Sequence, residues 1–301
     1  MRQWLYNDSS PVTEPKDILL FTDAELQVTR TGQVHNDFPD EANVADISLR
    51  LANRLETKRR HFWARNPAKA LAKVRKLIGL PENLPQPRVE RGGQDQTNWA
   101  RIDKFTLQRT GDMPVPALLF RPPGNTSHAL DVVVYADDRG MRNAAHANGP
   151  IRKLVNESTA VFAVDLRGLG ETRDQGSNAK YHSHSHRVGN VATHIGQPLL
   201  GQRVRDLLSV VDYLNQVGSE RARSIRMIGV GSVGPVALHA ATLDARISKV
   251  ELRNPAMNSW VDEAVTQPLR REMVDHVVPG ALAWYDLPDL ARQLGARLRT
   301  R

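Results

Sequence analysis

Short apolar runs, separated by polar turns, fill the middle of the chain. Four of them have the continuous apolar character of strands that are buried on both faces of a sheet: DVVVYADDRG (131–140), STAVFAVDLRG (158–168), SIRMIGV (224–230) and ISKVELR (247–253). Helical spacing is present in three segments between the runs, 149–158, 203–217 and 234–243. This order of strands and helices predicts an α/β fold with a mostly parallel sheet covered by helices on both faces.

The pattern before residue 99 is different. Residues 1–45 are polar and interrupted by prolines, which predicts an irregular arm. Helical spacing follows over 43–60, and Asn66-Pro67 provides a cap and a first-turn proline for a second helix. The segment 81–98 is rich in Pro, Gly and Gln and is therefore the predicted linker.

Two alternating segments around a TGDMP turn, 102–109 and 115–122, predict a hairpin that opens the sheet. We therefore expect residues 1–98 to form an N-terminal arm and helical extension with a linker. Residues 99–301 would form the α/β domain.

Composition narrows the possible partners of the chain. Its 301 residues contain no cysteine, which excludes disulfides, thiolate metal sites and a cysteine nucleophile. The formal net charge of +8 comes from scattered basic residues, and only 5% of residues are aromatic, so no nucleic-acid partner is predicted. The apolar runs are too short to cross a membrane, and no signal peptide is visible. We expect a cytoplasmic location by default and no membrane partner.

The segment MIGVGSVGPVALHAA (227–241) carries the most specific chemistry. Gly229, Gly231 and Gly234 complete a G-x-G-x-x-G between a strand and a helix, and Glu251 lies near the place of the acid of a dinucleotide site. This pattern favours a site for NAD(H) or NADP(H). That fingerprint usually opens the first βαβ unit, whereas two strands and two helices precede it here.

The same turn also has the features of a nucleophile elbow. Val230-Gly231-Ser232-Val233-Gly234 is similar to G-x-S-x-G, with Val230 in place of the first glycine. Ser232 is therefore a candidate nucleophile.

Other segments share this likeness. Asp165, Arg167, Gly168 and Gly170 match the D-x-R-G-x-G that follows the preceding strand in many α/β-hydrolases. Residues 197–214 and 277–291 resemble acetylxylan esterase-like members of that superfamily. The resemblance implies ester hydrolysis, often deacetylation of carbohydrate, with a small-molecule or carbohydrate ester as substrate and no cofactor.

The resemblance also implies an oxyanion hole and a catalytic triad. The donors would be the N–H of Val233 and an N–H near Asp137 or Asp138. Triad members follow in the order Ser, acid, His. Asp262 and His276 come after Ser232 in that order, whereas His239 lies inside the elbow helix and is expected to point away.

The usual acid and histidine follow a further core strand in such enzymes. No apolar run long enough for that strand follows Leu282, so we expect a sheet without its last strand or strands. The chain would then be a truncated esterase or a non-catalytic module, and the open sheet edge predicts self-association.

Two further patterns leave alternatives open. His182, His184 and His186 could form a metal site, although a polar loop is the favoured interpretation and no metal is predicted. Trp260 and Trp284 could line a sugar site or pack in the core. An ion pair between Asp165 and Arg167 is expected to hold its loop.

Overall fold

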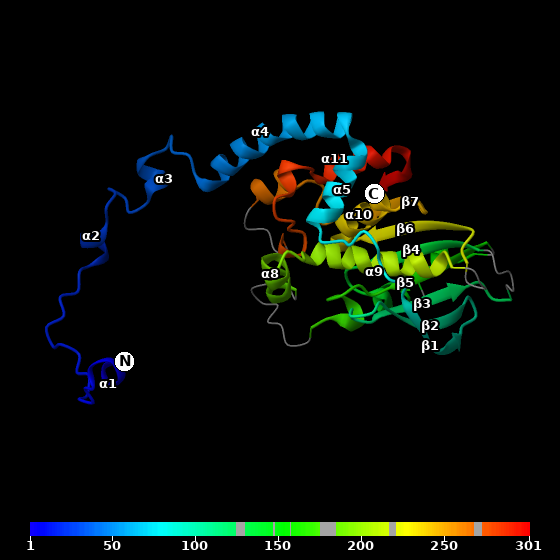
Figure 1. Ribbon diagram of the computed structural model, residues 1–301, viewed down its shortest axis with the longest axis horizontal. Coiled ribbons are helices and arrows are strands. Elements are labelled where there is room, and N and C mark those ends of the chain that lie inside the picture. Colours follow the sequence, from blue (N-terminus) through cyan, green and yellow to red (C-terminus); the bar gives the residue numbers. More distant parts are fainter. Residues whose placement is uncertain (125–129, 147, 157, 175–184, 217–220, 268–272) are drawn as a thin grey trace. The chain divides into compact units, whose positions relative to one another are not determined.

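The chain forms two compact units, Met1–Val44 and Ala45–Arg301, in a computed structural model (Figure 1). The structure describes residues 1–124, 130–146, 148–156, 158–174, 185–216, 221–267 and 273–301. The first unit contains the short helices α1 (Arg2–Tyr6), α2 (Asp23–Leu26) and α3 (Val34–Asp37). Large apolar side chains of this unit, such as Trp4 and Leu20, are exposed. A segment with so little burial agrees with the predicted irregular arm.

Eight strands of the described residues form one sheet in the order β1-β2-β3-β5-β4-β6-β7-β8. Their bounds are β1 Arg88–Gln96, β2 Arg101–Gln108, β3 Val115–Arg121, β4 Asp131–Asp137, β5 Thr159–Val164, β6 Ser224–Val230, β7 Ile247–Arg253 and β8 Leu298–Thr300. Strands β5, β4, β6, β7 and β8 run parallel, and β1 to β3 join antiparallel to β5. The predicted α/β fold is confirmed, including the 102–122 hairpin.

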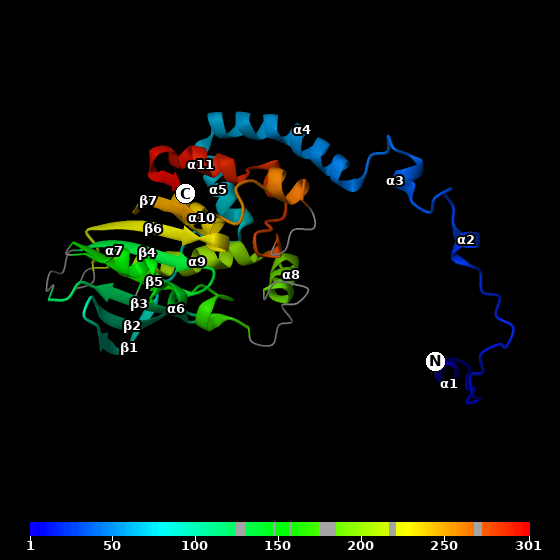
Figure 2. The same cartoon turned by 180° about the vertical axis from the view of Figure 1, so that it is seen from behind.

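Alternate residues of the central strands enter different hydrophobic cores. Val132 and Val134 of β4 belong to the larger core, whereas Val133 and Tyr135 belong to the smaller one. Helices of the larger core are α5 (Pro67–Leu77), α9 (Leu199–Leu214), α10 (Gly234–Leu243) and α11 (Leu287–Leu294). On the other face lie α6 (Met141–Ala144) and α7 (Pro150–Leu154), which Figure 2 shows in front of the sheet. Burial on both faces explains why these strands read as continuous apolar runs.

The helical extension is part of the second unit. Helix α4 (Val44–Arg65) is tied to the α/β core by Arg59, which donates to Asp289 and to the Leu282 carbonyl, both at 2.9 Å. The Trp63 indole N–H donates to the Trp284 carbonyl at 2.9 Å. The division of the chain into two units falls at Val44, and the domain boundary at 98 stays a prediction.

Local expectations failed at both edges of the sheet. The predicted linker contains β1, an exposed edge strand with a bulge between Arg91 and Gly93. Its composition is that of a loop, and it forms a strand because it pairs with β2. The sequence after Leu282 also forms a strand, because β8 pairs with three residues of β7 without an apolar run of its own. None of the helices in the described part of the chain is long and apolar enough to span a membrane.

Candidate functional site

The candidate site is the turn between β6 and α10. It contains one 3-10 turn, Gly231–Val233, and Gly231 adopts a left-handed conformation with φ of +59°. Among the described residues other than glycine, only Asn7 and Asn254 have positive φ, so Ser232 does not have a left-handed backbone. Nucleophile elbows hold their serine on a strained turn. Here the left-handed position belongs to a glycine, which adopts it without strain, one residue before the predicted nucleophile.

Sheet register brings the loop after β4 to this turn. Asp137 on β4 lies opposite Val230 on β6, so the following residue, Asp138, reaches the 3-10 turn. The Ser232 N–H donates to Asp138 Oδ2 at 2.8 Å. The role of the Val233 N–H as an oxyanion donor stays a prediction, and the N–H that donates to this carboxylate belongs to Ser232. The Asp138 carboxylate thus occupies one backbone donor of the turn.

The carboxylate and the glycine are fitted closely to each other. A Cβ added at Gly231 would lie 1.9 Å from Asp138 Oδ2, much closer than two such atoms approach. Burial raises the pKa of Asp138 above its usual value, against the lowering effect of the Ser232 N–H. Asp138 therefore stays bonded to this turn only while residue 231 has no side chain.

The side chain of Asp137 stabilises the same loop. Its carboxylate is buried and accepts from the Tyr135 hydroxyl at 3.3 Å and from the Arg139 N–H at 3.0 Å. Burial, followed by the charge of Asp137, raises the pKa of Tyr135 well above its usual value. These bonds use the side chain of Asp137 to close the loop, and neither of them involves Ser232.

The loop after β5 is held by the carboxylate of Asp165 and by the guanidinium of Arg167, through separate contacts. Asp165 accepts the backbone N–H groups of Met141 and Glu171 at 2.6 and 2.9 Å. Arg167 pairs with Asp206 on α9 at 2.5 Å and with Asp112 at 2.9 Å. The expected ion pair between Asp165 and Arg167 is therefore replaced by contacts to other segments. Both residues have the structural role that the sequence analysis favoured.

The structure places the predicted acid and base in a different segment. Asp262 is exposed, and its N–H donates to Ser259 Oγ at 3.2 Å. His276 is buried, and its carbonyl accepts the Trp260 indole N–H at 3.0 Å. The contacts described for Ser232 lead to Asp138, so they do not join the three residues. The triad Ser232, Asp262 and His276 stays a prediction.

His239 lies in the core, as expected. Its ring nitrogens lie 2.7 Å from the Pro235 carbonyl and 3.0 Å from the Tyr285 hydroxyl. Burial lowers its pKa to about 4. The ring is neutral at pH 7 and is enclosed between α10 and Tyr285.

The remaining candidates divide between core and surface. His182 and His184 lie outside the described residues, and His186 begins helix α8 (His186–His194), where its ring lies 3.1 Å from the Asn190 amide. No metal-binding group of three His, Cys, Asp or Glu is present among the described residues. Trp260 is buried and packs on Tyr285, so its place in the core is confirmed.

The dinucleotide alternative meets an electrostatic obstacle. Glu251, its candidate acid, pairs with Arg253 at 2.7 Å on the sheet. A pyrophosphate bound at the start of α10 would have to approach the carboxylate of Asp138. Repulsion between these like charges disfavours that ligand.

The fold and the turn after β6 define an α/β-hydrolase-like protein. No protein-family model matches the sequence, and no curated protein does. Solved structures are similar in fold: a putative acetyl xylan esterase from Bacteroides fragilis NCTC 9343 has a TM-score of 0.62 at 16% identity, over 91% of this chain and 74% of that one. An acetyl xylan esterase from Paenibacillus sp. R4 has a TM-score of 0.52 at 20% identity, over 81% and 78%.

A glucuronoyl esterase from Solibacter usitatus is also similar, with a TM-score of 0.54 at 13% identity over 79% of this chain and 74% of that one. At these identities the likeness establishes the fold alone. The chain therefore has the α/β-hydrolase fold found in carbohydrate esterases, as its sequence resemblance implied.

Sequence reasoning placed the turn correctly but missed its two decisive residues. The G-x-G-x-x-G pattern did include Gly231, yet only the backbone angle identifies it as the left-handed residue of the turn. Asp138 was chosen for the N–H groups of its loop, whereas its carboxylate makes the contact. No local signal distinguishes these two roles.

Proposed function

We propose that this chain is a binding module with an α/β-hydrolase fold, which takes up a small polar or carbohydrate ligand without acyl transfer. The observation that carries this proposal is the 2.8 Å hydrogen bond from the Ser232 N–H to Asp138. Acyl transfer requires backbone N–H groups that stabilise the negative oxygen of the tetrahedral intermediate, and the donor at the elbow is the N–H of the residue after the nucleophile, here Val233. The Asp138 carboxylate, bonded to the neighbouring Ser232 N–H, would repel that negative oxygen.

The position of the loops supports a binding role. Ligands of open α/β sheets bind outside the carboxyl ends of the parallel strands. The Asp138 and Asp165 loops both lie at those ends and are fixed by hydrogen bonds, partly buried at Asp138 and buried at Asp165. A rigid loop pair of this kind orders a binding surface in advance.

Serine ester hydrolysis is the second candidate function. It is favoured by the fold and by the place of Ser232 directly after the central strand β6. Ser232 would attack the ester carbonyl, His276 would take its proton, and Asp262 would orient the histidine. This mechanism requires Asp138 to leave the Ser232 N–H and requires the three residues to meet.

Fluorophosphonate labelling with peptide mapping separates the two functions. We expect no label on Ser232 of the folded protein in a time that fully labels a known serine hydrolase. Saturation-transfer NMR should show binding of acetylated xylo-oligosaccharides to the same sample. Label on Ser232 that is lost in Ser232→Ala and kept in Ser248→Ala would instead establish the esterase. Ser248 is a suitable control because it lies at the start of β7, away from the turn.

A further inference from the structure

A second cavity lies away from the turn after β6. It has a volume of about 730 Å³ and is lined by α4, α5, residues 79–82, Gln197 and Trp284. Neither Ser232 nor Asp138 contributes to its lining. Cavities of about 300–1,000 Å³ are the usual size of small-molecule sites. The volume therefore suits a small organic ligand.

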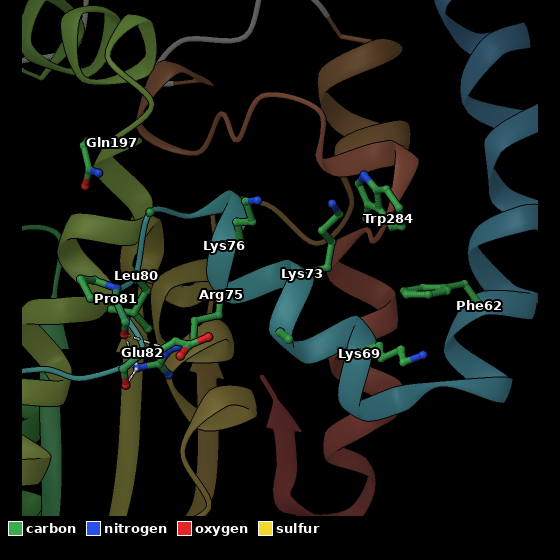
Figure 3. A pocket seen from close by; sticks show the side chains of 12 residues that line it. Phe62, Lys69, Lys73, Arg75, Lys76, Leu80, Pro81, Glu82, Gln197 and Trp284 are labelled. Atoms are coloured by element: carbon green, nitrogen blue, oxygen red, sulfur yellow. Dashed lines mark hydrogen bonds between the residues drawn. The ribbon is translucent and has the colours of Figure 1, made fainter.

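Cations outnumber acids in the lining of this cavity. Lys69, Lys73 and Lys76 follow each other at helical spacing on α5, so they share one side of the helix. Figure 3 shows Lys73 and Lys76 extending from α5 toward the space between Gln197 and Trp284. None of the three lysines forms an ion pair with another described residue, and Glu82 is the acid in the lining. The positive charge is therefore available to a ligand.

The cavity also has a fixed aromatic wall. Trp284 packs edge-on against Phe62 with ring centroids 5.5 Å apart, and Lys73 Nζ lies 4.0 Å from the Trp284 ring centre. The Trp63 indole N–H donates a hydrogen bond to the Trp284 carbonyl and fixes the backbone of that residue. This wall positions both a ring surface and a cation before any ligand arrives.

The opposite wall contains an arginine that is bonded to backbone carbonyls. Arg75 donates to the Pro81 carbonyl at 2.6 Å and to the Glu82 carbonyl at 3.1 Å. Its guanidinium thereby holds the 79–82 turn against α5 (Figure 3). Arg75 adds a fourth positive charge to the lining, beside the three lysines.

We propose that this cavity binds a small organic anion, a carboxylate or phosphate attached to a ring. The lysine ammonium groups would bind the anionic group, and Phe62 with Trp284 would contact the ring. The inference does not depend on the function proposed for the turn after β6, because the two sites share no residue.

Isothermal titration of the full chain with three ring probes tests this site. Benzoate carries a carboxylate, phenyl phosphate carries a phosphate, and benzyl alcohol is the neutral control. We expect binding of at least one anion, weakened by salt, and no binding of the alcohol. Binding of one anion alone identifies the bound group as a carboxylate or a phosphate. Binding of both supports a site for either anionic group on a ring. Two results overturn the proposal. One is binding of the alcohol that equals binding of the anions, and the other is no detectable binding of either anion at about 10 mM, ten times a dissociation constant of about 1 mM.

Matched lysine variants locate the site. The double variant Lys69→Gln/Lys76→Gln should weaken binding of the anion roughly fivefold or more, because each exposed pair contributes a modest free energy. Lys58→Gln removes an exposed charge from α4 outside the cavity and should leave the affinity unchanged. An equal loss in both proteins would show attraction to a generally basic surface and would refute the site. Circular dichroism of each variant checks that it is folded.

Discussion

The substitution Gly231→Ala tests whether the turn after β6 is built around Asp138. A left-handed conformation costs an alanine about 1–2 kcal/mol. The added Cβ would also lie 1.9 Å from Asp138 Oδ2 and displace that carboxylate from the Ser232 N–H. Loss of a hydrogen bond to a charged group costs about 1.5–3 kcal/mol. We therefore expect the free energy of unfolding to fall by about 3–5 kcal/mol.

Urea denaturation, followed by circular dichroism and tryptophan fluorescence, measures this loss, provided that both probes report one transition. Gly111→Ala is the matched control, because Gly111 has φ of +76° and no atom within 4 Å of an added Cβ. It should lose only the strain of about 1–2 kcal/mol. Equal losses at both positions would refute the role of Asp138, and so would a loss below about 0.5 kcal/mol at Gly231.

Three other predictions concern buried and paired charges. Burial keeps His239 neutral and lowers its pKa to about 4, so its contribution to the free energy of unfolding is fully present above pH 6.5 and falls by up to roughly 3 kcal/mol as the pH drops toward 4. Thermal denaturation at several pH values should show a weaker pH dependence in His239→Gln. An unchanged pH dependence in that variant would contradict this role. Arg59→Met should destabilise the protein by about 2–4 kcal/mol in urea, because buried Asp289 loses its partner on α4; Arg54→Met, on the exposed side of α4, is the control. The hydrogen bond from Arg223, followed by that from Ser224, lowers the pKa of Asp131 to about 2, so the contribution of Asp131 to stability is lost as the pH falls from 3.8 to that value. An NMR titration of Arg223→Gln should find the pKa of Asp131 raised. An unchanged pKa would contradict this cause.

The central strands could be predicted because their signal is local. Each of β4, β5 and β6 is a run of apolar residues between polar turns, and burial on both faces requires that composition. The end of α10 nearest Ser232 could likewise be placed, because Pro235 suits the first turn of a helix. These features depend only on residues that are close together in the chain.

Other features depended on partners far along the chain. The spacing of Val44, Ile47 and Leu51 predicted a helix correctly, but these side chains are exposed, since burial depends on what packs against the helix. Strands β1 and β8 arise from pairing with β2 and β7, and their own residues carry no apolar pattern. Edge strands of this kind are poorly marked in a sequence because one side of the ladder is unpaired.

The sequence by itself determined the α/β fold, the turn after β6 and the glycine-rich character of that turn. The tertiary structure alone decided what the turn presents. Asp138 and Ser232 are separated by 94 positions, and only the parallel register of β4 and β6 brings the carboxylate to the N–H. A hydrogen bond requires two atoms within about 3 Å, and local sequence carries no information on such a distance between remote residues.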